Sequence, residues 1–328
     1  MLLSGGGERP RKPEDLIDSR LMARLDRIDL RTRRIFAGRI QGERRSKTRG
    51  QSVEFEDFRE YVEGDDLRFI DWNVYARLDR LIIKIFLEEE DLALHLVIDA
   101  STSMEAGSPS KLVFSARLAM ALAYVGLVNQ NRVAVSVMGL PGRTGLVRLG
   151  DRRGRRHVHR LGQFLVDTLW SDEVVRARAA TGAPAPGGDF TGALTTLARS
   201  RVGKGVMVVM SDLLAPEGYE AGLRNLAAAG GYDTWILQVL SPGEIDPAVD
   251  VEAGLTGDLR LLDAETGRAT EVTITNALIK RYRERLKSWC DGINAYCLAR
   301  EMTHLLVRSD AELERVIMDT LRRRGMVG

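Results

Sequence analysis

Cysteine is scarce in this chain of 328 residues, which contains only Cys290 and Cys297. On one helix these two would lie roughly 10 Å apart along the axis, too far for a disulfide, and free thiols are typical of a reducing compartment. A long hydrophobic run is also missing, because the longest, Leu118 to Val128, is shorter than the ~18 residues that a membrane helix needs. These absences predict a cytoplasmic protein without a transmembrane segment, at most peripheral to a membrane.

The chain also lacks an excess of charge of one sign. Lys and Arg total 48 against 46 acidic residues, which gives a net charge of +2 and excludes a strong general attraction to nucleic acid or anionic membranes. Two local runs, residues 31–49 and 152–160, are basic. Each is consistent with a solvated surface or with a docking site for acidic or phosphate-bearing partners. Because aromatic residues are nearly absent from both runs, nucleic acid is not an expected partner.

Apolar residues, by contrast, make up 44% of the chain, enough for a large core. After residue 90, continuous apolar strands alternate with helical periodicity, which predicts an α/β fold with a mostly parallel sheet and helices on both faces. Strands are expected at 92–98, 132–138, 146–149, 205–210, 234–240 and 304–307, and helices at 111–128, 157–169, 191–199, 219–228, 278–296 and 312–323. Residues 258–263 and 269–275 are expected to form an inserted C-terminal β-hairpin.

The N-terminal third has a different character. Residues 1–13 are rich in Gly and Pro and read as a flexible lead-in, and Glu14 to Arg33 has helical periodicity. Residues 14–90 are expected to form a small annex, and residues 91–328 the main domain. A β-rich segment, Leu81 to Leu87, precedes the apolar strand Leu92 to Ile98, so the two are expected to pair or to share one sheet.

Oxygen-bearing side chains follow two of the predicted strands. Asp99, Ser101 and Ser103 come at the end of the strand 92–98, and Asp212 follows the strand 205–210. The carboxyl ends of parallel strands are where ligands bind, and two carboxylates there would repel each other unless a cation lay between them. Carboxylates and hydroxyls suit a hard divalent cation. Alternatively, these residues only cap the helices that follow.

A third candidate segment is the glycine-rich loop Gly187-Gly-Asp-Phe-Thr191. With its residues included, the chain resembles the von Willebrand factor A-like fold, which is Rossmann-like, and its metal-ion-dependent adhesion site (MIDAS). That resemblance implies a site for Mg²⁺, or else Mn²⁺ or Ca²⁺, whose ligands are Asp99, Ser101, Ser103, Thr191 and Asp212. Many members carry the Thr directly after the paired glycines, where this sequence has Asp189, so either residue can be the loop ligand.

The segment ahead of the predicted main domain resembles the signature of a bacterial family that carries the domain of unknown function 58 and is usually encoded beside MoxR-type AAA+ ATPases. The matching residues are Ser52, Glu54-Phe55, Asp57, Arg59, Tyr61, Gly64 to Asp66, Arg68, Ile70 to Trp72 and Ala76-Arg77. The resemblance implies a non-enzymatic, chaperone-like adaptor that binds a MoxR-type ATPase and an unidentified client protein. In physical terms, the arginines and acids of this block predict either a structural network around its aromatic residues or a direct partner contact.

One enzymatic alternative is a Mg²⁺-dependent aspartyl phosphoryl-transfer enzyme with Asp99 as the nucleophile. Such enzymes need an acid two residues after the nucleophile, where this chain has Ser101, and the sequence shows no lysine plainly placed to neutralise a phosphate. The protein-binding hypothesis is therefore favoured.

Overall fold

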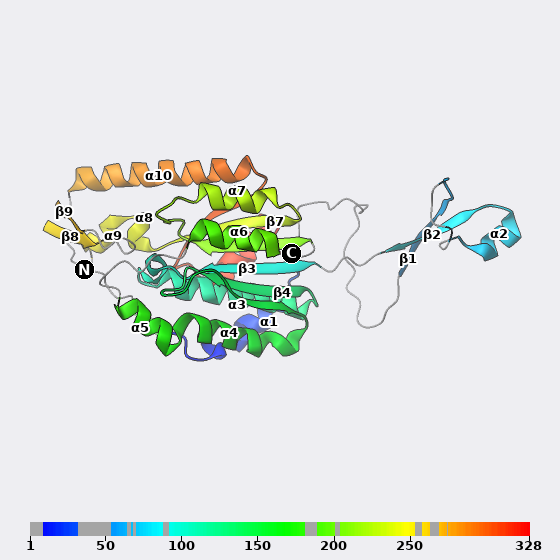
Figure 1. Ribbon diagram of the computed structural model, residues 1–328, viewed down its shortest axis with the longest axis horizontal. Helices are drawn as coiled ribbons and strands as arrows, with labels where there is room; N and C mark the ends of the chain where they lie inside the picture. Colours follow the sequence, from blue (N-terminus) through cyan, green and yellow to red (C-terminus); the bar gives the residue numbers. More distant parts are fainter. Residues whose placement is uncertain are drawn as a thin grey trace. The chain divides into compact units, whose positions relative to one another are not determined.

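The computed structural model describes residues 9–31, 54–63, 67, 70–87, 92–180, 189–200, 204–252, 258–262, 269–273 and 275–328. The chain divides into two units. Unit 1 comprises Met1–Arg39 and Leu92–Gly328, and unit 2 comprises Ile40–Asp91. Figure 1 labels the elements of both.

Unit 1 is built on a six-stranded sheet in the order β10-β7-β6-β3-β4-β5. Neighbouring strands are parallel, except that β5 runs antiparallel to β4. The mostly parallel α/β sheet predicted from the sequence is confirmed. The strands are β3 (Ala93–Asp99), β4 (Arg132–Met138), β5 (Val147–Arg152), β6 (Gly205–Ser211), β7 (Tyr232–Leu240) and β10 (Thr303–Arg308).

Helices cover both faces of this sheet (Figure 1). One face carries α6 (Phe190–Ser200), α7 (Glu220–Ala228) and α10 (Asn276–Leu298), and the other carries α1 (Ser19–Leu25), α3 (Lys111–Val128), α4 (Val158–Trp170) and α5 (Asp172–Ala180). Successive side chains of a strand point to opposite faces. Leu94 and Leu96 of β3 accordingly join one core cluster, and Ala93 and Val97 join the other.

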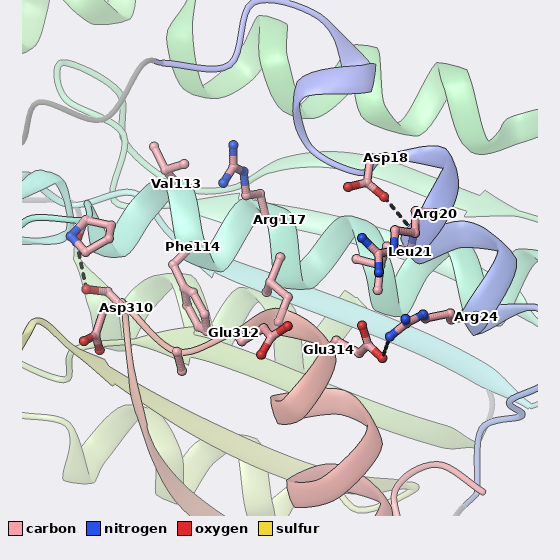
Figure 2. A pocket seen from close by; sticks show the side chains of 14 residues that line it. Asp18, Arg20, Leu21, Arg24, Val113, Phe114, Arg117, Asp310, Glu312 and Glu314 are labelled. Atoms are coloured by element: carbon pink, nitrogen blue, oxygen red, sulfur yellow. Dashed lines mark hydrogen bonds and ion pairs between the residues drawn. The ribbon is translucent and has the colours of Figure 1, made fainter.

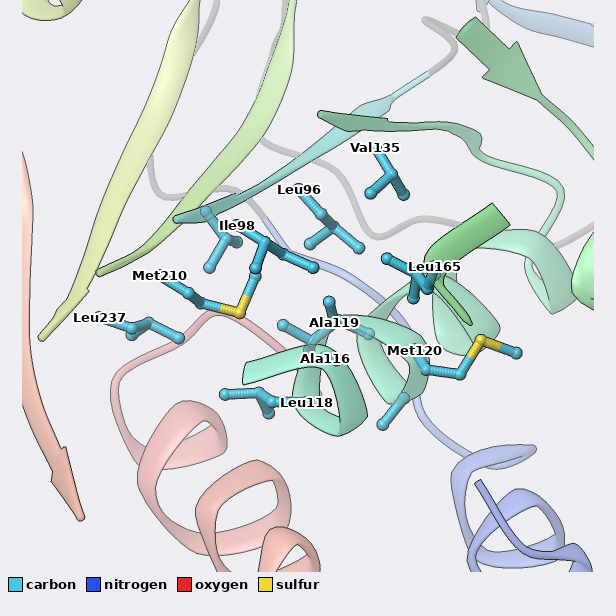
Figure 3. Packing of buried hydrophobic residues seen from close by; sticks show 14 of the residues in the cluster. Leu96, Ile98, Ala116, Leu118, Ala119, Met120, Val135, Leu165, Met210 and Leu237 are labelled. Atoms are coloured by element: carbon cyan, nitrogen blue, oxygen red, sulfur yellow. The ribbon is translucent and has the colours of Figure 1, made fainter. Parts of the chain in front are cut away.

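Helix α3 lies at the centre of the larger cluster. Figure 3 shows Ala116, Leu118 and Ala119 of α3 packed beneath Ile98 and Met210 of the sheet. By length and composition, α3 is the one helix among the described residues that is long and apolar enough to cross a membrane, yet 83% of it is buried inside the protein. A helix that is apolar all round is expected in a protein interior, and α3 has that role in unit 1.

Short elements complete unit 1. The expected hairpin is confirmed, because β8 pairs antiparallel with β9. The segment expected as a closing helix at 312–323 begins as one α-helical turn and continues as a π-helix. These elements are η1 (Pro13–Asp15), η3 (Thr102–Glu105), η4 (Arg155–His157), α8 (Pro242–Ile245), α9 (Pro247–Glu252), β8 (Asp258–Leu262), β9 (Ala269–Thr273), α11 (Leu313–Arg315) and η5 (Val316–Leu321).

Unit 2 is an antiparallel pair of strands, β1 (Glu54–Glu60) and β2 (Ile82–Leu87), with a short helix, α2 (Trp72–Leu78). Asp71 caps α2, because its carboxylate accepts the backbone N–H groups of Asn73 and Val74. Ile70 and Ile83 are buried and bridge to each other. Several large apolar side chains of this unit are exposed instead: Val62, Leu67, Trp72, Tyr75, Leu78 and Leu81.

Two expectations about the N-terminal third differ from the structure. Leu81 to Leu87 does not share a sheet with the strand that follows, because β2 pairs with β1 in unit 2 whereas β3 lies in the sheet of unit 1. The expected annex at 14–90 is also divided, since residues up to Arg39 belong to unit 1. Leu25 and Leu30 are buried in its core, which explains why this segment packs there.

The helix expected from Glu14 to Arg33 is shorter in the structure. It forms η1 and α1, and α1 ends at Leu25. The chain then continues without helix to Leu30, which makes an antiparallel bridge with Val327 near the C-terminus. This bridge explains why a helical periodicity in the sequence does not produce one continuous helix.

Candidate functional site

The first three predicted ligands come together at the end of β3. Asp99 is 5% exposed, and its Oδ1 accepts the Ser101 backbone N–H at 3.0 Å. Its Oδ2 accepts the hydroxyl of Ser211, at the end of β6, at 2.6 Å. The Oγ atoms of Ser101 and Ser103 are 3.2 Å apart. The β3 loop therefore gathers one carboxylate and two hydroxyls beside the neighbouring strand.

Asp212 follows β6 and contributes the second carboxylate. It is 1% exposed, and its Oδ1 accepts the backbone N–H of Leu214 at 3.1 Å. Burial raises the pKa of Asp99 to about 6, and the charge of Asp212 adds to the rise, whereas hydrogen bonds from Ser211 and Ser101 oppose it. The two carboxylates are thus close enough to act on each other in a desolvated environment.

A buried lysine that the sequence analysis missed lies beside Asp212. The side chain of Lys111, the first residue of α3, is fully buried, and its Nζ donates to Asp212 Oδ2 at 2.8 Å and to Glu244 of α8. Burial lowers the pKa of Lys111, but attraction to Asp212 and Glu244 outweighs it, so the pKa lies above its usual value. The sequence feature that could have pointed to Lys111 is its position at the start of a helix that is otherwise almost entirely apolar.

An arginine from α5 holds the β3 loop from the other side. The Nη1 of Arg178 donates to Glu105 Oε1 at 2.8 Å and to the Leu169 carbonyl at 2.9 Å, and its Nη2 donates to the Ala100 carbonyl at 3.4 Å. Its side chain is 4% exposed. The helix that carries Arg178 was not predicted, so this contact could not be inferred from the sequence.

Gly139, directly after β4, forms the wall against which Asp99 lies. Its φ is +70°, and a Cβ there would lie 2.8 Å from Asp99 Oδ1 and 3.0 Å from the Ser101 nitrogen. A side chain at this position would displace the carboxylate. Three neighbouring strand ends, those of β3, β4 and β6, therefore shape the site.

In the structure, Asp189 caps a helix. Its Oδ1 accepts the backbone N–H of Gly192 at 2.6 Å, which caps α6. Thr191 lies in the first turn of α6, where its carbonyl accepts the hydroxyl of Thr195. Among the hydrogen bonds of the described residues, none joins the Thr191 side chain to Asp99 or Asp212. Gly187 and Gly188 lie outside the described residues.

The candidate ligands of this site all offer oxygen atoms. Within the described residues, no group of three or more His, Cys, Asp or Glu side chains is arranged to hold a metal ion. The candidate centre instead combines two carboxylates with serine hydroxyls. Adjacent ligands of an octahedral Mg²⁺, each at about 2.1 Å, lie about 3.0 Å apart, close to the separation of the two serine Oγ atoms. Carboxylate and hydroxyl oxygens are the donor types that a hard divalent cation binds.

Comparison with known protein families identifies the group to which this chain is related. The model of the family "Protein of unknown function DUF58" matches residues 57–288, more than two thirds of the chain. The chain belongs to the DUF58 family. The match includes much of the signature block seen in the sequence.

Relatives of this DUF58 protein occur in mycobacteria. Uncharacterized proteins of Mycobacterium bovis and Mycobacterium tuberculosis are 28% identical to it over 266 residues, which is 80% of this chain and 77% of each relative. A shorter match, 36% identical over 87 residues, covers 26% of this chain and 47% of an uncharacterized protein of Mycobacterium avium.

Two solved structures have a distant likeness to the DUF58 protein. The conserved hypothetical protein BatB of Bacteroides thetaiotaomicron is 14% identical, with a TM-score of 0.38, over 71% of this chain and 98% of its own. An aerotolerance-related membrane protein of Bacteroides fragilis is 15% identical, with a TM-score of 0.37, over 70% of this chain and 99% of its own.

The family-signature block lies only partly within the described residues of the DUF58 protein. Ser52, Gly64 to Asp66 and Arg68 fall outside them. Asp71 caps α2, and Trp72 is 59% exposed and meets Tyr75 edge to face. Trp72 is therefore a largely exposed aromatic residue on α2.

Of the two basic runs, the one at 152–160 lies within the described residues. Arg155 donates to the Tyr124 hydroxyl at 2.7 Å, and Arg153 donates to the Gln130 carbonyl at 2.5 Å. These two arginines tie the segment between β5 and α4 to the rest of unit 1, which is a structural role. Most of the run at 31–49 lies outside the described residues.

The DUF58 protein also has an open cleft of about 620 Å³ beside α1, α3 and α11. Figure 2 shows the ion pair between Arg24 and Glu314 among its lining residues. Asp310 pairs with Arg308, and Glu312 pairs with Arg315, so these acids are compensated by neighbours. The lining contains none of the candidate metal ligands, and the cleft is separate from the donor set at the strand ends.

Proposed function

We propose that this protein is a non-enzymatic protein-binding module whose interaction site is a divalent-metal centre of the von Willebrand factor A type. The observation that carries the proposal is the pair of buried carboxylates, Asp99 and Asp212, at the ends of adjacent strands. Lys111 pairs with Asp212 and with Glu244, so among the ion pairs of the described residues one ammonium serves these two carboxylates and none serves Asp99. Two negative charges are then uncompensated when all three acids are ionised, which matches the charge of a divalent cation.

In this proposal, Asp99, Ser101, Ser103 and Asp212 hold the cation, and Thr191 completes the site from α6. The metal supplies an open coordination position for a carboxylate of the partner. The protein residues fix the position of the ion, and Gly139 and Arg178 keep the β3 loop in place through the contacts described above. Mg²⁺ is the expected ion, with Mn²⁺ and Ca²⁺ as substitutes that share its oxygen preference.

The partner in this proposal is a MoxR-type AAA+ ATPase, and the complex acts on a client protein as a chaperone-like adaptor. Support comes from the family resemblance and from the exposed apolar side chains of unit 2. Trp72 and Leu78 are 59% and 64% exposed on the short helix α2. Clustered exposed apolar residues are typical of protein-binding surfaces.

The phosphoryl-transfer alternative gains one feature from the structure, because a lysine does lie beside Asp212. That lysine, however, is fully buried and already bound by two carboxylates, and Ser101 stands where the second acid would be needed. Activity on a generic aryl phosphate that is abolished in Asp99→Asn would establish the enzymatic function instead.

The direct experiment is capture of a purified MoxR-type AAA+ ATPase by this protein. With Mg²⁺ present, wild type should retain the ATPase, and Asp99→Ala should not. Chelator should release the ATPase from wild type. In parallel, Mg²⁺ or Mn²⁺ should raise the Tm of wild type but not that of Asp99→Ala. Equal retention by both proteins, with and without chelator, would contradict metal-dependent binding.

A further inference from the structure

Lys111 pairs with the candidate ligand Asp212, and it contacts two carboxylates that follow different strands. Its Nζ lies 2.8 Å from Asp212 Oδ2, after β6, and also contacts Glu244 Oε1, after β7. The two acids differ in environment, since the side chain of Asp212 is 1% exposed and that of Glu244 is 27% exposed. If Asp212 binds another cation, the ammonium of Lys111 can therefore still pair with Glu244.

Glu244 is itself fixed in place. Its Oε2 accepts the Ser241 backbone N–H at 2.8 Å and the Ser241 hydroxyl at 3.0 Å, which leaves Oε1 to face Lys111. Gly107, in the loop before α3, approaches the same serine so closely that a Cβ would lie 2.4 Å from Ser241 Cβ. The position of Glu244 therefore does not depend on Lys111 alone.

We propose that Lys111 is a built-in counter-cation that competes with the metal for Asp212 and moves onto Glu244 when the metal binds. This inference rests on the proposed metal centre and adds the device that regulates its occupancy. Without metal, the ammonium compensates the charge of Asp212. With metal, two cations would face each other across Asp212, and transfer of the ammonium to Glu244 relieves that repulsion.

In this proposal, the affinity for metal depends on how the Lys111 ammonium is shared between Asp212 and Glu244. Removing the ammonium should strengthen binding, because the metal no longer displaces a charge from Asp212. Removing the Glu244 carboxylate should weaken binding, because the ammonium then has only Asp212. A coupling of this kind between two cations is expected to change the Kd by about tenfold.

The test is a Mn²⁺ titration of the full-length protein, followed by the electron paramagnetic resonance signal of free Mn²⁺. Lys111→Met should bind with a Kd about tenfold lower than wild type, and the matched control Lys280→Met, at an exposed lysine of α10, should bind as wild type does. A Kd for Lys111→Met equal to that of the control would overturn the inference while leaving the metal centre intact.

A double-mutant cycle separates transfer of the ammonium from a general effect of charge. Glu244→Gln should raise the Kd about fivefold in the wild-type background and much less in the Lys111→Met background. Equal effects in both backgrounds would overturn the inference. Glu244→Gln keeps the ammonium bound to Asp212, so it can be measured even if circular dichroism shows that Lys111→Met does not fold, and an unchanged Kd for Glu244→Gln would then overturn the inference.

Failure of the metal centre itself would look different. If neither wild type nor Lys111→Met binds Mn²⁺, both the proposed function and the inference are wrong. If only Lys111→Met binds, the lysine blocks the site in the native protein, which supports the competition and contradicts the proposed function.

Discussion

At the scale of single residues, the candidate site depends on side chains whose environment the sequence does not reveal. The placement of Asp99, Ser101, Ser103 and Asp212 after strands could be predicted, because each follows an apolar run. Lys111 could not be assigned, since its partners Asp212 and Glu244 are distant in the sequence. Asp189 was an ambiguous ligand in the sequence and is a helix cap in the structure.

Gly139 provides a prediction at this scale. Gly139→Ala should destabilise the protein by roughly 2 kcal/mol more than Gly145→Ala, and only the former should weaken Mn²⁺ binding. Both glycines have positive φ, +70° and +83°, so both alanines are strained, but a Cβ at Gly145 meets no atom within 4 Å. Urea unfolding checks the difference. Equal losses of unfolding free energy in the two variants would mean that contact between a Cβ at position 139 and Asp99 does not destabilise the protein.

His304 predicts a pH dependence of stability. Burial lowers its pKa to about 4, and its Nε2 lies 3.0 Å from Gln238 Oε1. Because the unfolded chain takes up this proton at about pH 6.5, stability is fully present above that pH and falls as the pH drops toward 4. Relative to His304→Gln, wild type should lose roughly 2 kcal/mol of unfolding free energy between pH 7 and pH 4.5. Parallel losses in both proteins would refute this assignment.

At the scale of elements, continuous apolar strands were the most predictable feature. The strand predicted at 132–138 has the bounds of β4, and the helix predicted at 111–128 has those of α3. Helix α5 was missed because it has little apolar periodicity, and its interior contacts come from Val174 and Arg178. Strand β5 runs antiparallel to β4. The pattern of apolar residues in a strand does not show in which direction it pairs, so this could not be predicted.

The role of α5 in the site can be tested through its arginine. Arg178→Met should destabilise the protein by about 3 kcal/mol, because Glu105 and the carbonyls of Ala100 and Leu169 lose a buried donor. Arg176→Met, the same change at an exposed position of the same helix, should cost less than about 0.5 kcal/mol. Thermal unfolding of the two variants measures this, and similar Tm values would exclude an anchoring role for Arg178.

At the scale of the whole molecule, the division into two units was only partly predictable. The sequence indicated an annex ahead of the α/β domain, but it could not show that residues near Leu25 and Leu30 return to the core of the larger unit. Their apolar spacing is equally compatible with either unit, and the bridge from Leu30 to Val327 joins opposite ends of the chain.

This division predicts that unit 1 folds without unit 2. The six strands of its sheet and both large core clusters come from unit 1. Replacing residues 40–91 by a flexible Gly/Ser linker should leave cooperative thermal unfolding, with the far-ultraviolet dichroism of an α/β protein. A truncated protein without a cooperative transition would show that unit 2 is needed for the fold.

The central claim, a divalent-metal centre between the ends of β3 and β6, is tested most directly by crystals soaked in Mn²⁺. The account predicts one anomalous difference peak bordered by the hydroxyls of Ser101 and Ser103 and by the carboxylates of Asp99 and Asp212, absent from crystals of Asp99→Ala. A wild-type crystal with no peak there, or with an equal peak in Asp99→Ala, would contradict it.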